Sequence, residues 1–89
     1  MQARIYISGF VQGVGFRYFV KSNAKRLGLK GWVQNSPDGK VMVLAQGSKE
    51  TIEKLIKLCG KGPFLSEVKT VDVGWEEEQE HLEDFKVTR

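Results

Sequence analysis

A glycine-rich stretch near the N-terminus carries residues whose types and spacing suit anion binding. The stretch from Ile7 to Arg17 reads ISGFVQGVGFR, an alternating apolar run that breaks at Gly13 and Gly15 and reopens as an amphipathic segment. Because glycine has no Cβ, the backbone there can adopt positive φ and approach a ligand closely. The first amides of a helix have no intrahelical partner and lie at the positive end of its dipole. The stretch therefore predicts that the amides from Gly13 to Arg17 converge on a phosphate-sized anion.

Arg17 adds a fixed charge to this predicted site. Its guanidinium is protonated at any working pH and can bind two oxygens of one anion, whereas a lysine offers only a point charge. Two better-known phosphate loops do not fit the stretch. The P-loop requires Lys and then Ser or Thr directly after its second glycine, whereas Phe16 and Arg17 follow Gly15 here. The dinucleotide-binding loop requires a small residue where Tyr18 stands.

The periodicity of apolar residues predicts the elements that position this stretch. Alternation every second residue indicates half-buried strands, and a spacing of three and four indicates helices with one inward face. The Pro-Asp-Gly sequence after Ser36 predicts a hairpin turn and Ser48 predicts an N-cap. Gly60, Gly62 and Pro63 predict the end of a helix. In chain order, we expect a strand at Ala3–Val11, a helix at Phe16–Leu27, strands at Leu29–Asn35 and Lys40–Gln46, a helix that begins at Ser48 and is stopped by Gly60, Gly62 and Pro63, a strand at Val68–Trp75 and a short edge strand within Glu83–Thr88.

This order predicts an α+β fold, a ferredoxin-like two-layer sandwich in which both helices of a βαββαβ unit cover one face of an antiparallel sheet. The first and second strands then run parallel with the third between them, so they end on one rim about 10 Å apart, two strand spacings. Asn35 ends the second strand, and the loop before Arg17 follows the first. We therefore expect Arg17 and Asn35 to face the same small anion.

Length and composition fit one globular domain spanning residues 1–89. No apolar run is long enough to cross a membrane, so no membrane partner is expected. The net charge of +3 comes from lysines spread over the chain rather than from a basic stripe, so no nucleic acid is expected either. Cys59 is the single cysteine, which agrees with a cytoplasmic location and with a place in the core.

Two motifs together resemble the acylphosphatase family. The first is Gly9–Arg17, GFVQGVGFR, and the second is Gly31–Gly47, GWVQNSPDGKVMVLAQG. The resemblance implies hydrolysis of the carboxyl-phosphate anhydride of small acyl phosphates to a carboxylate and inorganic phosphate. It implies that the Asn35 side chain orients the attacking water and that a phosphate oxygen of the substrate accepts the water's proton. It also implies that no metal or cofactor is required. By the same resemblance, Arg17 and a backbone loop hold the phosphate, the loop residues being Gln12, Gly13, Val14, Gly15, Phe16 and Arg17.

Other interpretations of the same residues are weaker. An Arg in a glycine-rich turn is often a surface residue, and an Asn before a turn is often structural, but their joint occurrence inside two motifs favours catalytic roles. RNA-recognition domains share the element order but place stacking aromatics on central strands, where this chain has Met42 and Leu44. His81 has no second metal-ligand candidate beside it, so we expect an exposed, non-catalytic histidine.

A further alternative is an accessory acylphosphatase-like domain, such as the one at the N-terminus of a hydrogenase maturation protein that handles carbamoyl phosphate. The short length of the chain as one domain argues against it. We expect a monomer that acts on its own small-molecule substrate.

Overall fold

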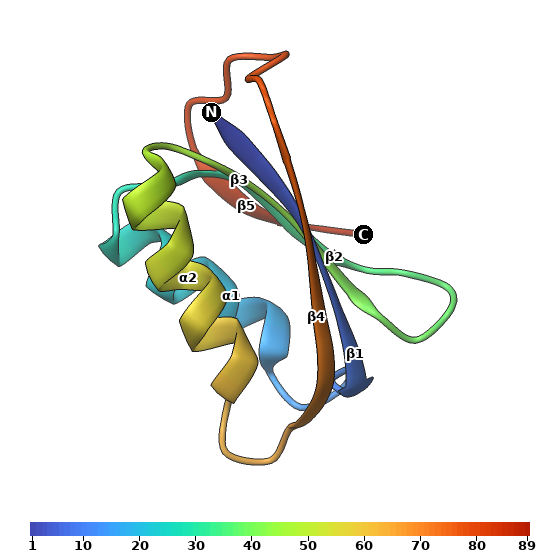
Figure 1. Ribbon diagram of the computed structural model, residues 1–89. Coiled ribbons are helices and arrows are strands. Elements are labelled where there is room, and N and C mark those ends of the chain that lie inside the picture. Colours follow the sequence, from blue (N-terminus) through green and yellow to red (C-terminus); the bar gives the residue numbers. More distant parts are fainter.

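The computed structural model describes residues 1–89 and shows two helices packed on one face of a five-stranded sheet (Figure 1). This confirms the predicted ferredoxin-like α+β sandwich. The elements are β1 at Gln2–Phe10, α1 at Phe16–Arg26, β2 at Lys30–Asn35, β3 at Val41–Gln46, α2 at Lys49–Lys61, β4 at Glu67–Glu76 and β5 at Phe85–Thr88.

The strand order is β4-β1-β3-β2-β5. Because β3 is antiparallel to both β1 and β2, these two strands run parallel and end at the same edge of the sheet, as predicted. Val41 pairs with Ile7 on one side and with Asn35 on the other, so Asn35 lies level with Ile7 and two strands away from it. The short C-terminal strand is present as β5. It pairs in parallel with β2, which makes the sheet mixed rather than wholly antiparallel.

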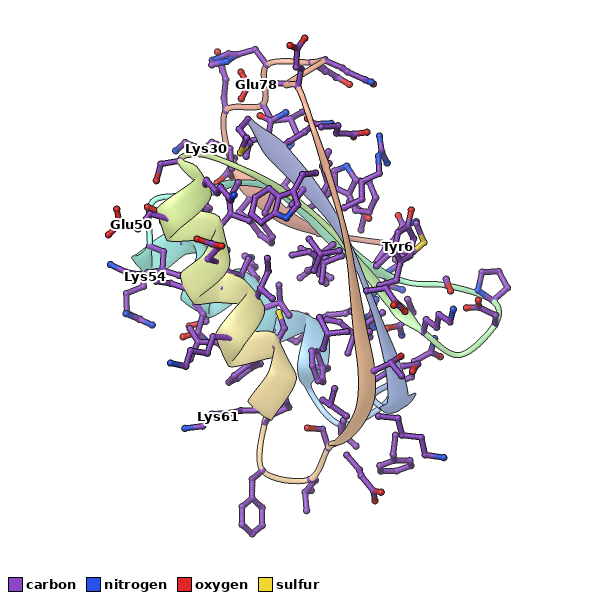
Figure 2. The ribbon with its side chains drawn as sticks, viewed as in Figure 1. Tyr6, Lys30, Glu50, Lys54, Lys61 and Glu78 are labelled. Carbon is purple, nitrogen blue, oxygen red and sulfur yellow. The ribbon has the colours of Figure 1, made fainter.

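The core lies between the sheet and the helices. Alternate residues of β1, including Ile5 and Ile7, are fully buried beneath α1 and α2, as their spacing predicts. Cys59 on α2 is also fully buried, which confirms its predicted place, and this burial raises the pKa of its thiol to about 12. The charged residues labelled on α2, Glu50, Lys54 and Lys61, lie on the outer side of the helix layer (Figure 2).

Helix α2 begins and ends where the sequence predicts. The Ser48 hydroxyl oxygen accepts a hydrogen bond from the Thr51 backbone amide at 3.1 Å, which confirms the N-cap. The predicted stop at Gly60, Gly62 and Pro63 is confirmed: Gly60 is still helical, Lys61 is the last helical residue, and Gly62, with a φ of 70°, is the C-cap. A glycine permits the left-handed conformation of a helix end without requiring it. None of the helices has the length and apolar character needed to span a membrane.

Candidate active site

The connection between β1 and α1 turns at two glycines with left-handed backbones. Gly13 has a φ of 75° and Gly15 a φ of 78°. A Cβ added at either position would meet no atom within 4 Å, so it is the backbone conformation rather than a lack of space that favours glycine. Gly15 is also the residue before the first turn of α1. The two glycines therefore set the direction of the amides at the start of the helix.

These amides have no partners in the backbone. The first amide after the connection to donate within the helix is that of Phe19, which donates to the Gly15 carbonyl at 3.0 Å, and the amides from Gln12 to Tyr18 donate to no backbone carbonyl. No side chain caps α1, and its first turn contains no acidic residue. The positive end of the helix dipole is therefore left without a negative group from the chain, which is the arrangement that binds an anion.

Arg17 and Asn35, predicted from separate motifs, line the same small hollow of about 110 Å³. Gln12 and Val14, also predicted loop residues, are not among the lining residues. The hollow is lined by Val11, Gly13, Gly15, Phe16, Arg17, Tyr18 and Asn35. It contains no carboxylate and no histidine, so Arg17 supplies its positive charge and no carboxylate or imidazole is placed to act as a base.

Asn35 has an unusual feature within this hollow. Its side-chain oxygen Oδ1 is the one buried side-chain polar atom of the chain that has no hydrogen-bond partner. Leaving a buried acceptor without a donor costs about 1–3 kcal/mol, so such atoms are rare in folded proteins and call for an explanation. Because Asn35 lines the hollow, a rotation of its side chain would turn Oδ1 toward a ligand or solvent molecule there that donates a hydrogen bond.

The side chain of Gln12 contacts the hairpin that carries Asn35. Its Nε2 donates to the carbonyl oxygens of Ser36 and Lys40, both at 2.9 Å. Sequence reasoning assigned Gln12 only a backbone amide and missed this contact. The available signal was a long amide side chain beside Gly13, at the edge where the end of β2 was already expected to lie.

The turn between β2 and β3 contains the acidic residue closest in sequence to Asn35. Hydrogen bonds from the Ser36 hydroxyl and then from the Lys40 backbone amide lower the pKa of Asp38 below its ordinary value of 3.8. Asp38 does not line the hollow. It therefore stabilises its own turn as a carboxylate and is poorly suited to accept a proton at neutral pH.

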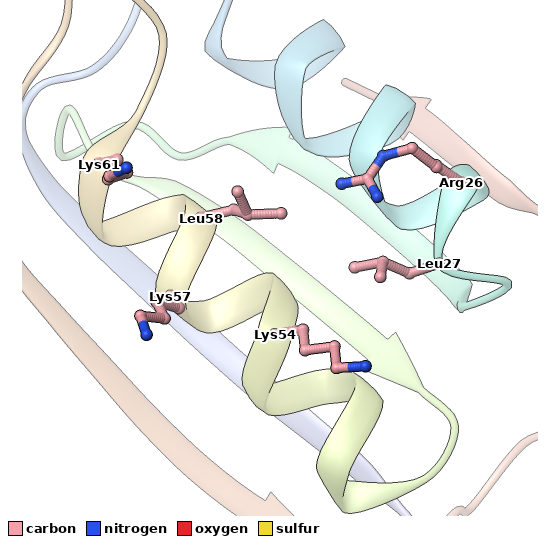
Figure 3. A pocket seen from close by; sticks show the side chains of 6 residues that line it. All are labelled: Arg26, Leu27, Lys54, Lys57, Leu58 and Lys61. Carbon is pink, nitrogen blue, oxygen red and sulfur yellow. The ribbon is translucent and has the colours of Figure 1, made fainter.

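A larger hollow of about 280 Å³ lies on the helix side, lined by Arg26, Leu27, Lys54, Lys57, Leu58 and Lys61 (Figure 3). It is also positively charged, but its charges sit on long exposed side chains, and Lys57 points away from Arg26 (Figure 3). It has no unpaired helix amides and no buried orphan atom. Of these two hollows, the smaller one is where fixed polar groups converge.

Comparisons with known proteins agree with the motifs. The Acylphosphatase family model matches residues 3–87. The chain is 47% identical to an acylphosphatase of Thermococcus kodakarensis, with 98% of this chain and 94% of the relative aligned. It superposes on the crystal structure of an acylphosphatase from Bacillus subtilis with a TM-score of 0.96 and 36% identity, covering 99% and 98% of the two chains.

A second kind of neighbour is much longer. The chain superposes on HypF of T. kodakarensis with a TM-score of 0.86 and 31% identity, covering all of this chain (100%) but only 12% of HypF. The acylphosphatase relatives, in contrast, are matched over nearly their full length. Sequence, structure and family model thus agree from one end of the fold to the other, and the chain belongs to the acylphosphatase family of enzymes.

Proposed function

We propose that this enzyme hydrolyses small acyl phosphates by direct attack of water on phosphorus. Arg17 and the amides of Gln12 to Arg17 hold the phosphoryl group, and the Asn35 side chain holds the water. The observation that carries the proposal is that Asn35, whose Oδ1 has no hydrogen-bond partner, lines the same hollow as Arg17. The Arg17 guanidinium can bind an anion, and the Asn35 side chain can accept a hydrogen bond from a water molecule beside that anion.

Phosphate binding uses groups that the folded chain leaves free. The amides before Phe19 have no backbone acceptors, and no acidic residue competes for them in the first turn of α1. The Arg17 guanidinium can bind two further oxygens of the same group. Charge spread over the phosphoryl oxygens in the transition state would strengthen these contacts, and hydrogen bonds to charged groups contribute about 1.5–3 kcal/mol each.

Water is the natural partner for Asn35. Once the Asn35 side chain turns Oδ1 toward the hollow, an O–H of water can donate to it, which leaves a lone pair of the water oxygen free to face phosphorus. Fixing the water in line with the bond that breaks removes part of the entropic cost of bringing two reactants together. The amide NH₂ of the same side chain can donate to a phosphoryl oxygen or to the water and so limit rotation.

The reaction balances without a protein base. The water oxygen forms a new bond to phosphorus, the bond from phosphorus to the acyl oxygen breaks, and its electron pair leaves with the carboxylate. The proton released by water passes to a phosphoryl oxygen of the substrate, since neither carboxylate nor imidazole lines the hollow. A carboxylate is a good leaving group, so positioning and charge stabilisation can provide most of the catalysis.

The lengths of the relatives support a reaction carried out by this domain itself. Acylphosphatases of Salinibacter ruber and T. kodakarensis are aligned over 87% and 94% of their own lengths, whereas HypF is covered over 12%. An accessory role within a larger protein would leave most of that larger protein unmatched. The free acyl phosphate is therefore the favoured substrate class.

Asn35→Ala tests the proposal most simply. The water-positioning group is lost while Arg17 and the loop amides remain. We expect kcat for acetyl phosphate to fall by about a hundredfold or more, as when one transition-state hydrogen-bond donor is removed, and the affinity for inorganic phosphate to change little. The variant should melt close to the wild type, because Oδ1 has no partner to lose in the folded chain.

The matched control is Gln34→Leu. Gln34 is the neighbour of Asn35 on β2, and its Oε1 accepts a hydrogen bond from the Thr88 hydroxyl at 2.8 Å, away from the hollow. Its loss should leave kcat near the wild-type value. Strongly weakened phosphate binding with an unchanged kcat in Asn35→Ala would assign Asn35 to binding and overturn the proposed mechanism.

A further inference from the structure

We propose that the side chain of Gln12 is a positioning residue, which holds the phosphate-binding loop at a fixed place relative to Asn35. The inference rests on the proposed function, in which the loop holds the phosphoryl group and Asn35 holds the water. Its own support is the bridge from the Gln12 side chain to the hairpin between β2 and β3.

The bridge is made at two points. The Nε2 of Gln12 carries two hydrogens, and it donates to the carbonyl oxygens of Ser36 and Lys40 at 2.9 Å each. Ser36 follows Asn35 directly, and Lys40 precedes Val41, the strand partner of Asn35. Gln12 therefore binds both ends of the turn between β2 and β3, immediately beyond the residue that we place at the water.

The two carbonyls belong to a closed turn. The Ser36 amide donates to the Lys40 carbonyl at 2.9 Å, and the Gly39 amide donates to the Ser36 carbonyl at 3.1 Å. Each carbonyl thus serves both the turn and Gln12, using both of its lone pairs. The hydrogen bonds within the turn make it rigid. A contact from Gln12 to the base of the turn therefore holds the phosphate-binding loop at a fixed position relative to the end of β2.

The loop has no other side-chain hydrogen bond of this kind. Val11 and Phe16 pack into the core and anchor both ends of the connection, but no side chain except that of Gln12 forms a hydrogen bond from Val11 to Gly15. The neighbouring Gly13 has open space where a Cβ would stand. Without the bridge, the middle of the loop can shift relative to Asn35 while both ends stay in place.

A shift of the loop should lower kcat without a matching loss of phosphate affinity. The loop amides and Arg17 move with the phosphoryl group, so phosphate affinity should be largely retained. The distance and angle between the water at Asn35 and phosphorus should change, and a misplacement of about 1 Å can cost about a hundredfold in rate. The structure therefore predicts that Gln12 acts on kcat through Asn35.

Gln12→Leu removes the donors and keeps a side chain of similar size. We expect kcat for acetyl phosphate to fall by about 10- to 100-fold, while KM and the Kd of inorganic phosphate stay within about threefold. Gln34→Leu, which removes a side-chain hydrogen bond from the same end of β2, should leave all three constants near wild type. Should Gln12→Leu fail to fold, Gln12→Met keeps an unbranched chain without donors and serves for the same comparison.

A double-mutant cycle with Asn35→Ala decides whether Gln12 acts through Asn35. In the Asn35→Ala background, we expect Gln12→Leu to lower kcat by less than about threefold. No side chain then positions the water, so the position of the loop relative to residue 35 no longer matters. A full, multiplicative loss in that background overturns the inference, as does a wild-type kcat in folded Gln12→Leu. If Asn35→Ala alone leaves kcat unchanged, the proposed function fails instead.

Discussion

Replacing Arg17 with lysine tests whether two-oxygen binding, rather than positive charge alone, is needed for catalysis. The side chain of Arg17 takes part in none of the ion pairs of the folded chain, which are Arg4–Glu76, Lys25–Asp84 and His81–Glu78. The substitution therefore removes no internal salt bridge. We expect the free energy of unfolding to change by no more than about 0.5 kcal/mol, as for most surface substitutions.

The expected loss of activity follows from the geometry of the two side chains. Lysine keeps the charge at the hollow but loses the planar fork, so one of two charge-assisted hydrogen bonds to the phosphoryl group disappears. A hydrogen bond to a charged group contributes about 1.5–3 kcal/mol. At about 1.4 kcal/mol for each factor of ten, kcat/KM should fall by about 10- to 150-fold.

The assay is phosphate release from acetyl phosphate by purified wild type and Arg17→Lys, each with a thermal melt. Arg26→Lys makes the same change near the other end of α1, outside the hollow, and should leave kcat/KM unchanged. If folded Arg17→Lys retains activity within about twofold of wild type, the forked contact with phosphate is refuted.

Two further predictions concern product binding and acid stability. Inorganic phosphate should inhibit competitively against acetyl phosphate, because both need Arg17 and the loop amides; purely non-competitive inhibition would place phosphate elsewhere. Hydrogen bonds from Gln2 and then Arg4 lower the pKa of Glu76 below its ordinary value of 4.5, so their stabilisation is present above about pH 4.5 and is lost as the pH falls through the lower, folded-state pKa. Glu76→Gln should therefore lose less Tm than wild type on acidification, and parallel losses in both proteins would contradict this linkage.

Much of the fold was readable from local patterns in the chain. The alternation in β1, the N-cap at Ser48 and the turn after Ser36 each specify local backbone geometry, and the structure has all three. The end of α2 was predicted only to within Gly60, Gly62 and Pro63, because a glycine such as Gly60 tolerates a helical conformation as well as a left-handed one. The parallel pairing of β5 with β2 depends on which strand lies at the edge of the assembled sheet, and this cannot be predicted from a short segment of sequence.

The site was predictable in outline but not in its contacts. The strand order implied that Arg17 and Asn35 lie close together, because the loop with Arg17 follows β1, Asn35 ends β2, and these two parallel strands end at the same edge of the sheet. Neither the unpartnered Oδ1 of Asn35 nor the bridge from Gln12 follows from a local pattern, because each depends on side-chain positions across a gap between separate segments. Hydrogen bonds between residues 24 and 28 positions apart leave no periodic signal in the sequence.

The central claim is that water attacks phosphorus in a phosphoryl group held at Arg17 and Asn35. Hydrolysis of acetyl phosphate by the wild-type enzyme in water enriched in oxygen-18 tests it directly, with an enzyme-free reaction measured in parallel. Mass spectrometry of both products should find the enzyme-dependent label in inorganic phosphate, with acetate unlabelled. Label in acetate would mean that water attacks the acyl carbon, and it would contradict the assignment of this hollow to phosphoryl transfer to water.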